Sequence, residues 1–177
     1  MENASNALIM AASVLLGLMI ISVGVALFTS FSDFSATAYE EMQEKQLLEW
    51  NNKYLQYYGD ISNVDSKGRV TTSPIVVTAH DIVSVSNNAK QNNIYYELDK
   101  TSSGNENMYY VQVVVKDNSK TYANFESLTD TEKSNFLRDN SLTEENGELV
   151  QKQYKCSNAK ISKVTKRVYY IEFTNYE

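Results

Sequence analysis

The chain has little of the residue types on which most catalytic and metal sites depend. Among its 177 residues there is one cysteine, Cys156, and one histidine, His80. A single cysteine excludes an intrachain disulfide, and one histidine leaves little material for a zinc site or for histidine-based catalysis. There is also no glycine-rich phosphate loop and no paired-cysteine metal motif. We therefore expect a protein that is not an enzyme and has no cofactor and no bound metal.

Positive charge is scarce as well, with 16 Lys and Arg against 22 Asp and Glu and a net charge of −6. Such a balance argues against nucleic acid as a partner, because binding to its phosphates depends on an excess of basic side chains.

Charge is missing altogether from Ala7 to Phe28, "ALIMAASVLLGLMIISVGVALF". As a helix this run spans about 33 Å, close to the roughly 30 Å of a hydrocarbon core, and it is apolar on every face. It predicts a membrane anchor, and since no second span follows, we expect the polar remainder outside the cytoplasm. A cleaved signal peptide ending near Ala36-Thr37-Ala38 is the alternative, although the run is long for one and no basic residue precedes it.

Small residues recur in this segment at spacings that let helices approach closely. Two pairs four residues apart and two glycines seven apart supply them, namely Ser13, Gly17, Ser22, Ala26 and Gly24. Such spacing is either ordinary for a membrane helix or a sign that the helix packs against copies of itself.

The segment after the anchor contains no proline and no glycine until Gly59. Its apolar residues continue at helical spacing, so we expect one helix from about residue 4 to 58, with Gly59 as its stop. The predicted domains are therefore an anchor and stem at 1–58 and a head at 59–177. Leu47, Trp50 and Tyr54 lie in one sector of this helix and are expected to pack against the head.

The head is expected to be a sheet of about four antiparallel strands with two short helices, which makes the fold class α+β. Capping-box patterns at Thr78/Asp81 and Thr129/Glu132 predict the helix starts, the first helix covering 79–91. Asp60–Ser73 is expected to be a loop. Strands are predicted in two hairpins, over residues 93–100 with 107–117 and over 148–157 with 163–174.

Tyrosines occur in the doublets 57–58, 95–96, 109–110 and 169–170. In a strand, adjacent side chains face opposite sides, so each strand doublet should place one ring inward and one outward. The outward rings are either ordinary strand formers or an aromatic contact surface.

Basic residues concentrate near the C-terminus, where the stretch from Leu149 to Ile171 has no acid and six bases: Lys152, Lys155, Lys160, Lys163, Lys166 and Arg167. The stem from Asp33 to Glu49 instead carries five acids and one base. The basic stretch either contacts an acidic surface of another subunit or forms a solvated edge that discourages aggregation.

A long N-terminal helix, apolar and then amphipathic, followed by a small sheet resembles the subunits of type IV pili. The resemblance implies a membrane-held subunit that assembles with copies of itself into an extracellular filament. The family's glutamate at the fifth mature position is replaced here by Ala4 and Ser5, and the only early acid is Glu2, which we include among the candidate assembly residues. The opening "MENASNALIMAA" is also similar to single-span proteins of Clostridia-like bacteria, which implies no activity. The alternative function is a monomeric, membrane-anchored surface protein whose head binds a ligand or partner.

Overall fold

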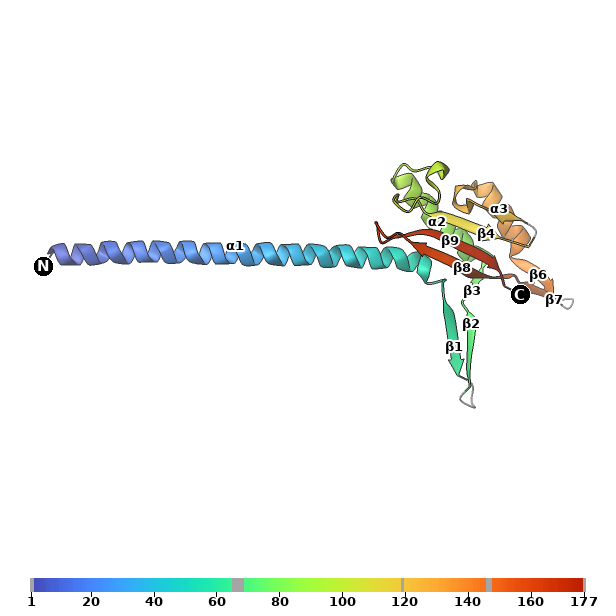
Figure 1. The fold of residues 1–177 in the computed structure, drawn as a ribbon, viewed down its shortest axis with the longest axis horizontal. Coiled ribbons are helices and arrows are strands. Elements are labelled where there is room, and N and C mark those ends of the chain that lie inside the picture. The colour runs from blue at the N-terminus through green and yellow to red at the C-terminus, as the bar shows by residue number, and fades with distance from the viewer. Residues whose placement is uncertain (1, 65–68, 119, 146–147, 177) are drawn as a thin grey trace. The chain divides into compact units, whose positions relative to one another are not determined.

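A computed structural model describes the whole chain except residues 1, 65–68, 119, 146–147 and 177 (Figure 1). Its first element is the helix α1, Glu2–Leu55, which confirms the long N-terminal helix predicted from the sequence. The helix ends three residues earlier than expected, and the chain then turns through Gly59, whose φ of +130° suits a residue without a side chain. Contacts divide the chain into residues 1–46 and 47–177, so the last turns of α1 belong to the head.

Residues 3–46 of α1 form a single helix with almost every side chain exposed. This is the one helix among the described residues that is long and apolar enough to cross a membrane, with a mean hydropathy of 2.6 over its most apolar window. The hydroxyls of Ser13 and Ser22 donate to the carbonyls of Met10 and Leu18, so neither is left unpaired in an apolar surrounding. The segment is compatible with a transmembrane anchor.

The head is a five-stranded mixed sheet with helices packed on one face, which confirms the α+β class (Figure 1). The strands, in spatial order, are β3 (Val76–Thr78), β8 (Gln153–Ile161), β9 (Val168–Asn175), β4 (Gln112–Lys116) and β5 (Thr121–Tyr122). The pairing is antiparallel except between β4 and β9, which run parallel. The hairpin predicted over 148–157 and 163–174 is confirmed in part: β8 and β9 pair antiparallel, but residues 148–151 belong to a separate strand.

The two predicted helices are present as α2 (Ala79–Tyr95) and α3 (Asp130–Asn140), together with the short 3₁₀ helices η1 (Lys100–Ser102) and η2 (Phe125–Ser127). Both predicted capping boxes are confirmed. At α2 the Asp81 backbone N–H donates to the Thr78 hydroxyl, and the Thr78 N–H donates to the Asp81 carboxylate at 3.0 Å. The same reciprocal pair joins Thr129 and Glu132 at α3.

Two predictions within the head were wrong. Residues 60–73 are not a loop but largely a hairpin of β1 (Asp60–Val64) and β2 (Val70–Pro74), which pair with each other only. Residues 93–100 are not a strand, because α2 continues to Tyr95 and a turn leads into η1, so the first predicted hairpin does not form. A further hairpin, which was also not anticipated as a separate element, joins β6 (Leu142–Glu145) and β7 (Glu148–Gln151).

The physical reason for the longer α2 is a pair of asparagine side chains near its end. Asn93 donates to the Val111 carbonyl at 3.0 Å and accepts from the Val111 N–H at 2.8 Å. Asn92 donates to the Tyr109 carbonyl. These amides pair with the backbone of the segment before β4, and that tertiary pairing outweighs the strand preference of Ile94, Tyr95 and Tyr96.

The core of the head is aromatic and includes the end of α1. Tyr54 is fully buried in one apolar cluster with Phe125, Phe136, Tyr154 and Phe173, and Trp50 packs against this cluster. The predicted packing of Trp50 and Tyr54 against the head is therefore present, while Leu47 is half-buried.

The hydroxyl of Tyr54 is buried and has no hydrogen-bond partner among the described residues. We expect Tyr54→Phe to leave the free energy of unfolding unchanged or to raise it by up to about 1 kcal/mol, because the variant removes an unpaired polar group. Tyr54→Ala should lower it by about 4 kcal/mol through loss of the ring. Urea unfolding of the full chain in detergent, followed by the fluorescence of the single tryptophan, measures both. A large decrease in the free energy of unfolding of Tyr54→Phe would contradict the description of the Tyr54 hydroxyl as unpaired.

Candidate functional site

Arg167, directly before β9, connects three parts of the head. Its guanidinium carbon lies 3.9 Å from the ring centre of Trp50, 5.1 Å from that of Tyr109 and 5.4 Å from that of Tyr96. The guanidinium also donates to the Tyr96 hydroxyl at 3.0 Å and to the Asn92 side-chain oxygen at 3.2 Å. A cation stacked on aromatic faces and hydrogen-bonded at its edge is held in one orientation.

The turn between β8 and β9 is fixed beside the same end of α1. The Asn51 side chain donates to the Lys166 carbonyl and accepts from the Val168 N–H, each at 2.9 Å. Lys166 has a φ of +58°, a left-handed conformation that this pairing holds in place. Within the turn, the Ser162 hydroxyl accepts from two further backbone N–H groups. The turn thus presents the exposed side chains of Lys163 and Lys166 from an ordered backbone.

A group of exposed aromatic side chains adjoins Arg167, and we call it the aromatic patch. Its members and their exposed fractions are Tyr95 (80%), Tyr96 (37%) and Tyr109 (44%). The rings of Tyr96 and Tyr109 are stacked with centres 4.6 Å apart, and Tyr95 meets Tyr96 edge-on at 5.0 Å. Exposed tyrosine, tryptophan and arginine together are typical of the energetically dominant residues of protein interfaces.

A shallow hollow of about 290 Å³ lies beside the aromatic patch. Its lining includes the rings of Trp50 and Tyr95, the amides of Asn88 and Gln91, and the cations of Lys53 and Arg167. Rings, amide donors and two positive charges are suited to a side chain that ends in a carboxylate.

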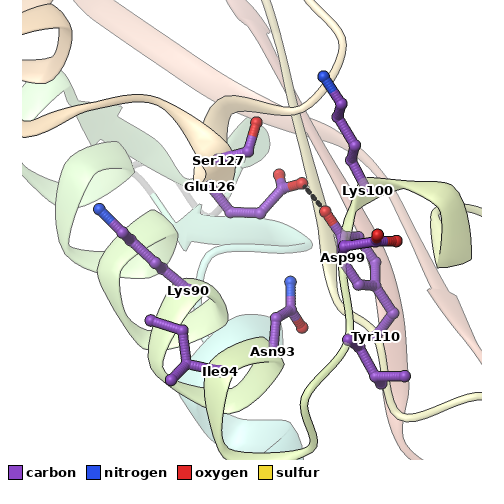
Figure 2. Close-up of a pocket in the computed structure, with 9 residues that line it drawn as sticks. Lys90, Asn93, Ile94, Asp99, Lys100, Tyr110, Glu126 and Ser127 are labelled. Atoms are coloured by element: carbon purple, nitrogen blue, oxygen red, sulfur yellow. Dashed lines mark hydrogen bonds between the residues drawn. The ribbon is translucent and has the colours of Figure 1, made fainter.

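A second pocket, of about 410 Å³, lies between α2 and the segments around η1 and η2 (Figure 2). At its base the buried Glu126 accepts from the Tyr110 hydroxyl at 2.5 Å and from the Val113 N–H at 2.8 Å. Lys90 and Lys100 project at its two sides (Figure 2). Burial raises the pKa of Glu126 above its usual value and outweighs the hydrogen bonds that lower it. Because both carboxylate oxygens are already paired, Glu126 serves to hold the pocket wall.

The six basic residues predicted as subunit contacts do not form one patch. Lys152 lies within the head, where its ammonium group contacts Asp117 at 2.7 Å and Asn140 at 2.8 Å. Lys155 and Lys160, both on β8, lie over the rings of Tyr176 and Tyr170 respectively. Lys163 and Lys166 are in the exposed turn, and Arg167 is engaged with the aromatic patch.

The residues predicted to pack helices are accessible in the single chain. A side chain added at Gly17 or Gly24 would meet no atom within 4 Å. Ser13, Ser22 and Ala26 are exposed as well, and the side chain of Glu2 lies outside the described part of the structure. Nothing in the chain itself covers this side of α1 over the described residues 3–46.

Two residues that invite a catalytic interpretation have ordinary surroundings. His80 is exposed in the first turn of α2. Burial raises the pKa of the Cys156 thiol to about 11, which keeps it protonated and poorly nucleophilic at neutral pH. Among the described residues, no group of three or more His, Cys, Asp or Glu side chains could hold a metal ion.

Comparisons with family models, with curated proteins and with solved structures found no match to this chain. The likeness to pilus subunits thus stays a prediction from the architecture of the sequence.

The sequence reasoning did not anticipate the aromatic patch as a single surface. Its signal was present in the doublets 95–96 and 109–110, but strands were expected there. Tyr109 is exposed and Tyr110 is buried, as the alternation rule requires, although both precede β4. Tyr95 and Tyr96 are both exposed, because they lie at a helix end.

The raised pKa of Glu126 makes a prediction about pH. The pKa of a glutamate in an unfolded chain is about 4.3. When the folded-state pKa is higher, ionisation of the acid lowers the free energy of unfolding as the pH rises from the unfolded-state pKa to the folded-state pKa. Glu126→Gln keeps the size of the side chain and both of its contacts. The glutamine carbonyl can accept from the Val113 N–H, and its amide can donate to the Tyr110 hydroxyl. We expect the stability of the variant relative to wild type to rise as the pH increases above about 4.3, measured by urea unfolding. A pH-independent difference for Glu126→Gln would contradict the prediction.

Proposed function

We propose that this protein is a structural subunit of an extracellular, pilus-like filament that is held in the membrane before assembly. The observation that carries the proposal is the exposed apolar surface of α1. Large side chains from Leu8 to Phe34 are more than half exposed, and no other part of the described chain covers them. Apolar surface of this extent requires lipid or copies of the same helix around it.

Lipid and protein are nearly equivalent surroundings for such an apolar helix. The burial of its apolar side chains therefore contributes little free energy to filament assembly. Moving an apolar side chain from lipid to a helix bundle gains little, so close packing of backbones and contacts between heads must favour the filament. The open sites at Gly17 and Gly24, with Ser13, Ser22 and Ala26, allow close approach of neighbouring helices. The hydroxyls of Ser13 and Ser22 already donate to carbonyls of the same helix, so packing leaves neither hydroxyl without a hydrogen bond.

A second candidate function is a monomeric anchored protein whose head binds a ligand or partner. The pocket of about 410 Å³ beside Glu126 favours it, because its volume and mixed lining suit a small molecule. The filament proposal is preferred because it also accounts for the small residues on α1.

Replacing the helix glycines separates the two functions. We expect Gly17→Leu and Gly24→Leu to abolish filaments in the sheared surface fraction, as seen by electron microscopy, because the added side chains hold neighbouring helices apart. The amount of protein in the membrane fraction should not change, since leucine favours insertion.

Ala7→Leu is the matched control, because it adds similar bulk to the same helix at least about 60° around its axis from each of the five small residues. It should leave filaments intact. Wild-type cells without filaments, with the protein still in the membrane fraction, would overturn the proposal and favour the anchored binding protein.

A further inference from the structure

Lys152, which lies between β7 and β8, contacts two side chains from other parts of the head. Its ammonium nitrogen lies 2.7 Å from Oδ1 of Asp117, just after β4, and 2.8 Å from Oδ1 of Asn140, at the end of α3. The cluster is largely shielded from water, because Asn140 is 6% exposed and the side chains of Lys152 and Asp117 are 20% and 8% exposed. An amine, an amide and a carboxylate therefore meet in one poorly hydrated place.

Further hydrogen bonds fix the orientation of both partners of Lys152. The Asn140 side-chain nitrogen donates to the Phe136 carbonyl at 3.0 Å, which turns the side-chain oxygen toward the ammonium group. Asp117 also accepts from the Asn175 side chain at 2.9 Å. Burial raises the pKa of Asp117, but the hydrogen bonds from Lys152 and Asn175 outweigh burial and hold the pKa below its usual value. Asp117 is therefore a carboxylate at neutral pH, and it can accept a proton.

We propose that Lys152 and Asn140 join through an intramolecular amide bond, with Asp117 as the catalytic residue. The Lys152 ammonium group gives a proton to the Asp117 carboxylate, and the lone pair of the neutral amine forms a bond to Cγ of Asn140. The bond between Cγ and the Asn140 side-chain nitrogen breaks, and its electron pair leaves with that nitrogen. The departing nitrogen takes up the two protons that the amine loses and leaves as an ammonium ion. Asp117 transfers both protons and ends as a carboxylate, so no oxidant or reductant takes part.

The surroundings select Asn140, rather than Asp117, as the group that Lys152 attacks. A carboxylate is a poor electrophile, whereas the carbonyl of a neutral amide is polarised by the ammonium group that it faces. Contact in a fixed orientation also raises the rate of such a reaction far above that of free groups in solution. The bond would tie the end of α3 to the start of β8, in a chain whose single cysteine excludes an internal disulfide.

Peptide mapping of the full-length protein, purified in detergent, tests the bond. Trypsin cuts after lysine and arginine, and neither residue occurs between Arg138 and Lys152. An acylated Lys152 is not cleaved, so the linked protein should give the peptide 139–155, lighter than its sequence mass by one ammonia, about 17 Da. A second digestion after the glutamates within this peptide should cut the chain without separating its two ends.

Two variants and one internal control show what the bond requires. Lys152→Arg keeps the positive charge beside Asp117 but replaces the amine by a guanidinium that stays protonated, so it should give no linked peptide. Asp117→Asn should lower the linked fraction at least about tenfold, with an unchanged circular dichroism spectrum. The Lys133 ammonium lies 2.9 Å from the Asn87 side-chain oxygen but makes no ion pair with another described residue. This second lysine–asparagine pair should stay unlinked.

The digests of the wild-type protein decide the proposal. Cleavage after Lys152, with a peptide 139–152 of full mass, would overturn the bond and leave an ion pair. Loss of ammonia with Lys152 still cleaved would overturn it as well, because it would show that Asn140 had closed a ring with its own backbone. A linked fraction that is unchanged in Asp117→Asn would overturn the role of the carboxylate. These results do not depend on whether the protein forms filaments.

Discussion

The burial of one helix end in the core of the head is the constraint on which the structure depends. Tyr54 is inaccessible to solvent, and Trp50 packs against the same cluster while its ring also carries the Arg167 guanidinium. The sheet thus uses part of α1 as a core element. As a result residues 47–55 of α1 and the aromatic patch are parts of one packed unit, and a change in the core at Tyr54 would also disturb the surface around Arg167.

The remainder of α1 follows a different rule, because its environment is not supplied by its own chain. In the head, apolar side chains are removed from water by the sheet and the two helices. In residues 3–46 they stay exposed, which is compatible with a transmembrane anchor and, under the proposed function, calls for lipid or for other copies of the helix around them. A function that brings copies together satisfies this requirement, and the same argument explains why small residues, rather than more apolar ones, are the informative positions.

The sequence predicted those features that depend on local pattern. The uncharged run and the missing proline and glycine predicted α1, and the Thr78/Asp81 and Thr129/Glu132 boxes predicted both helix starts. Predictions failed at Tyr95 and Tyr96, where aromatic residues favoured a strand but the side chains of Asn92 and Asn93 bind the backbone of a segment about 17 residues further on. No local pattern indicates such a pairing. The parallel partner of β4 was missed for the same reason, since β9 lies far along the chain.

The amino-acid order by itself determined that this protein has an apolar helix, an acidic stem, a basic C-terminal stretch and paired tyrosines, because these are properties of composition and spacing. Only the tertiary structure decided which of them meet. It placed Lys152 in an ion pair inside the head, left Lys163 and Lys166 exposed in a turn, and brought Arg167 onto three rings from distant segments. The physical reason is that stacking and hydrogen bonds act over a few ångströms, and only folding brings residues 50, 96, 109 and 167 within that range.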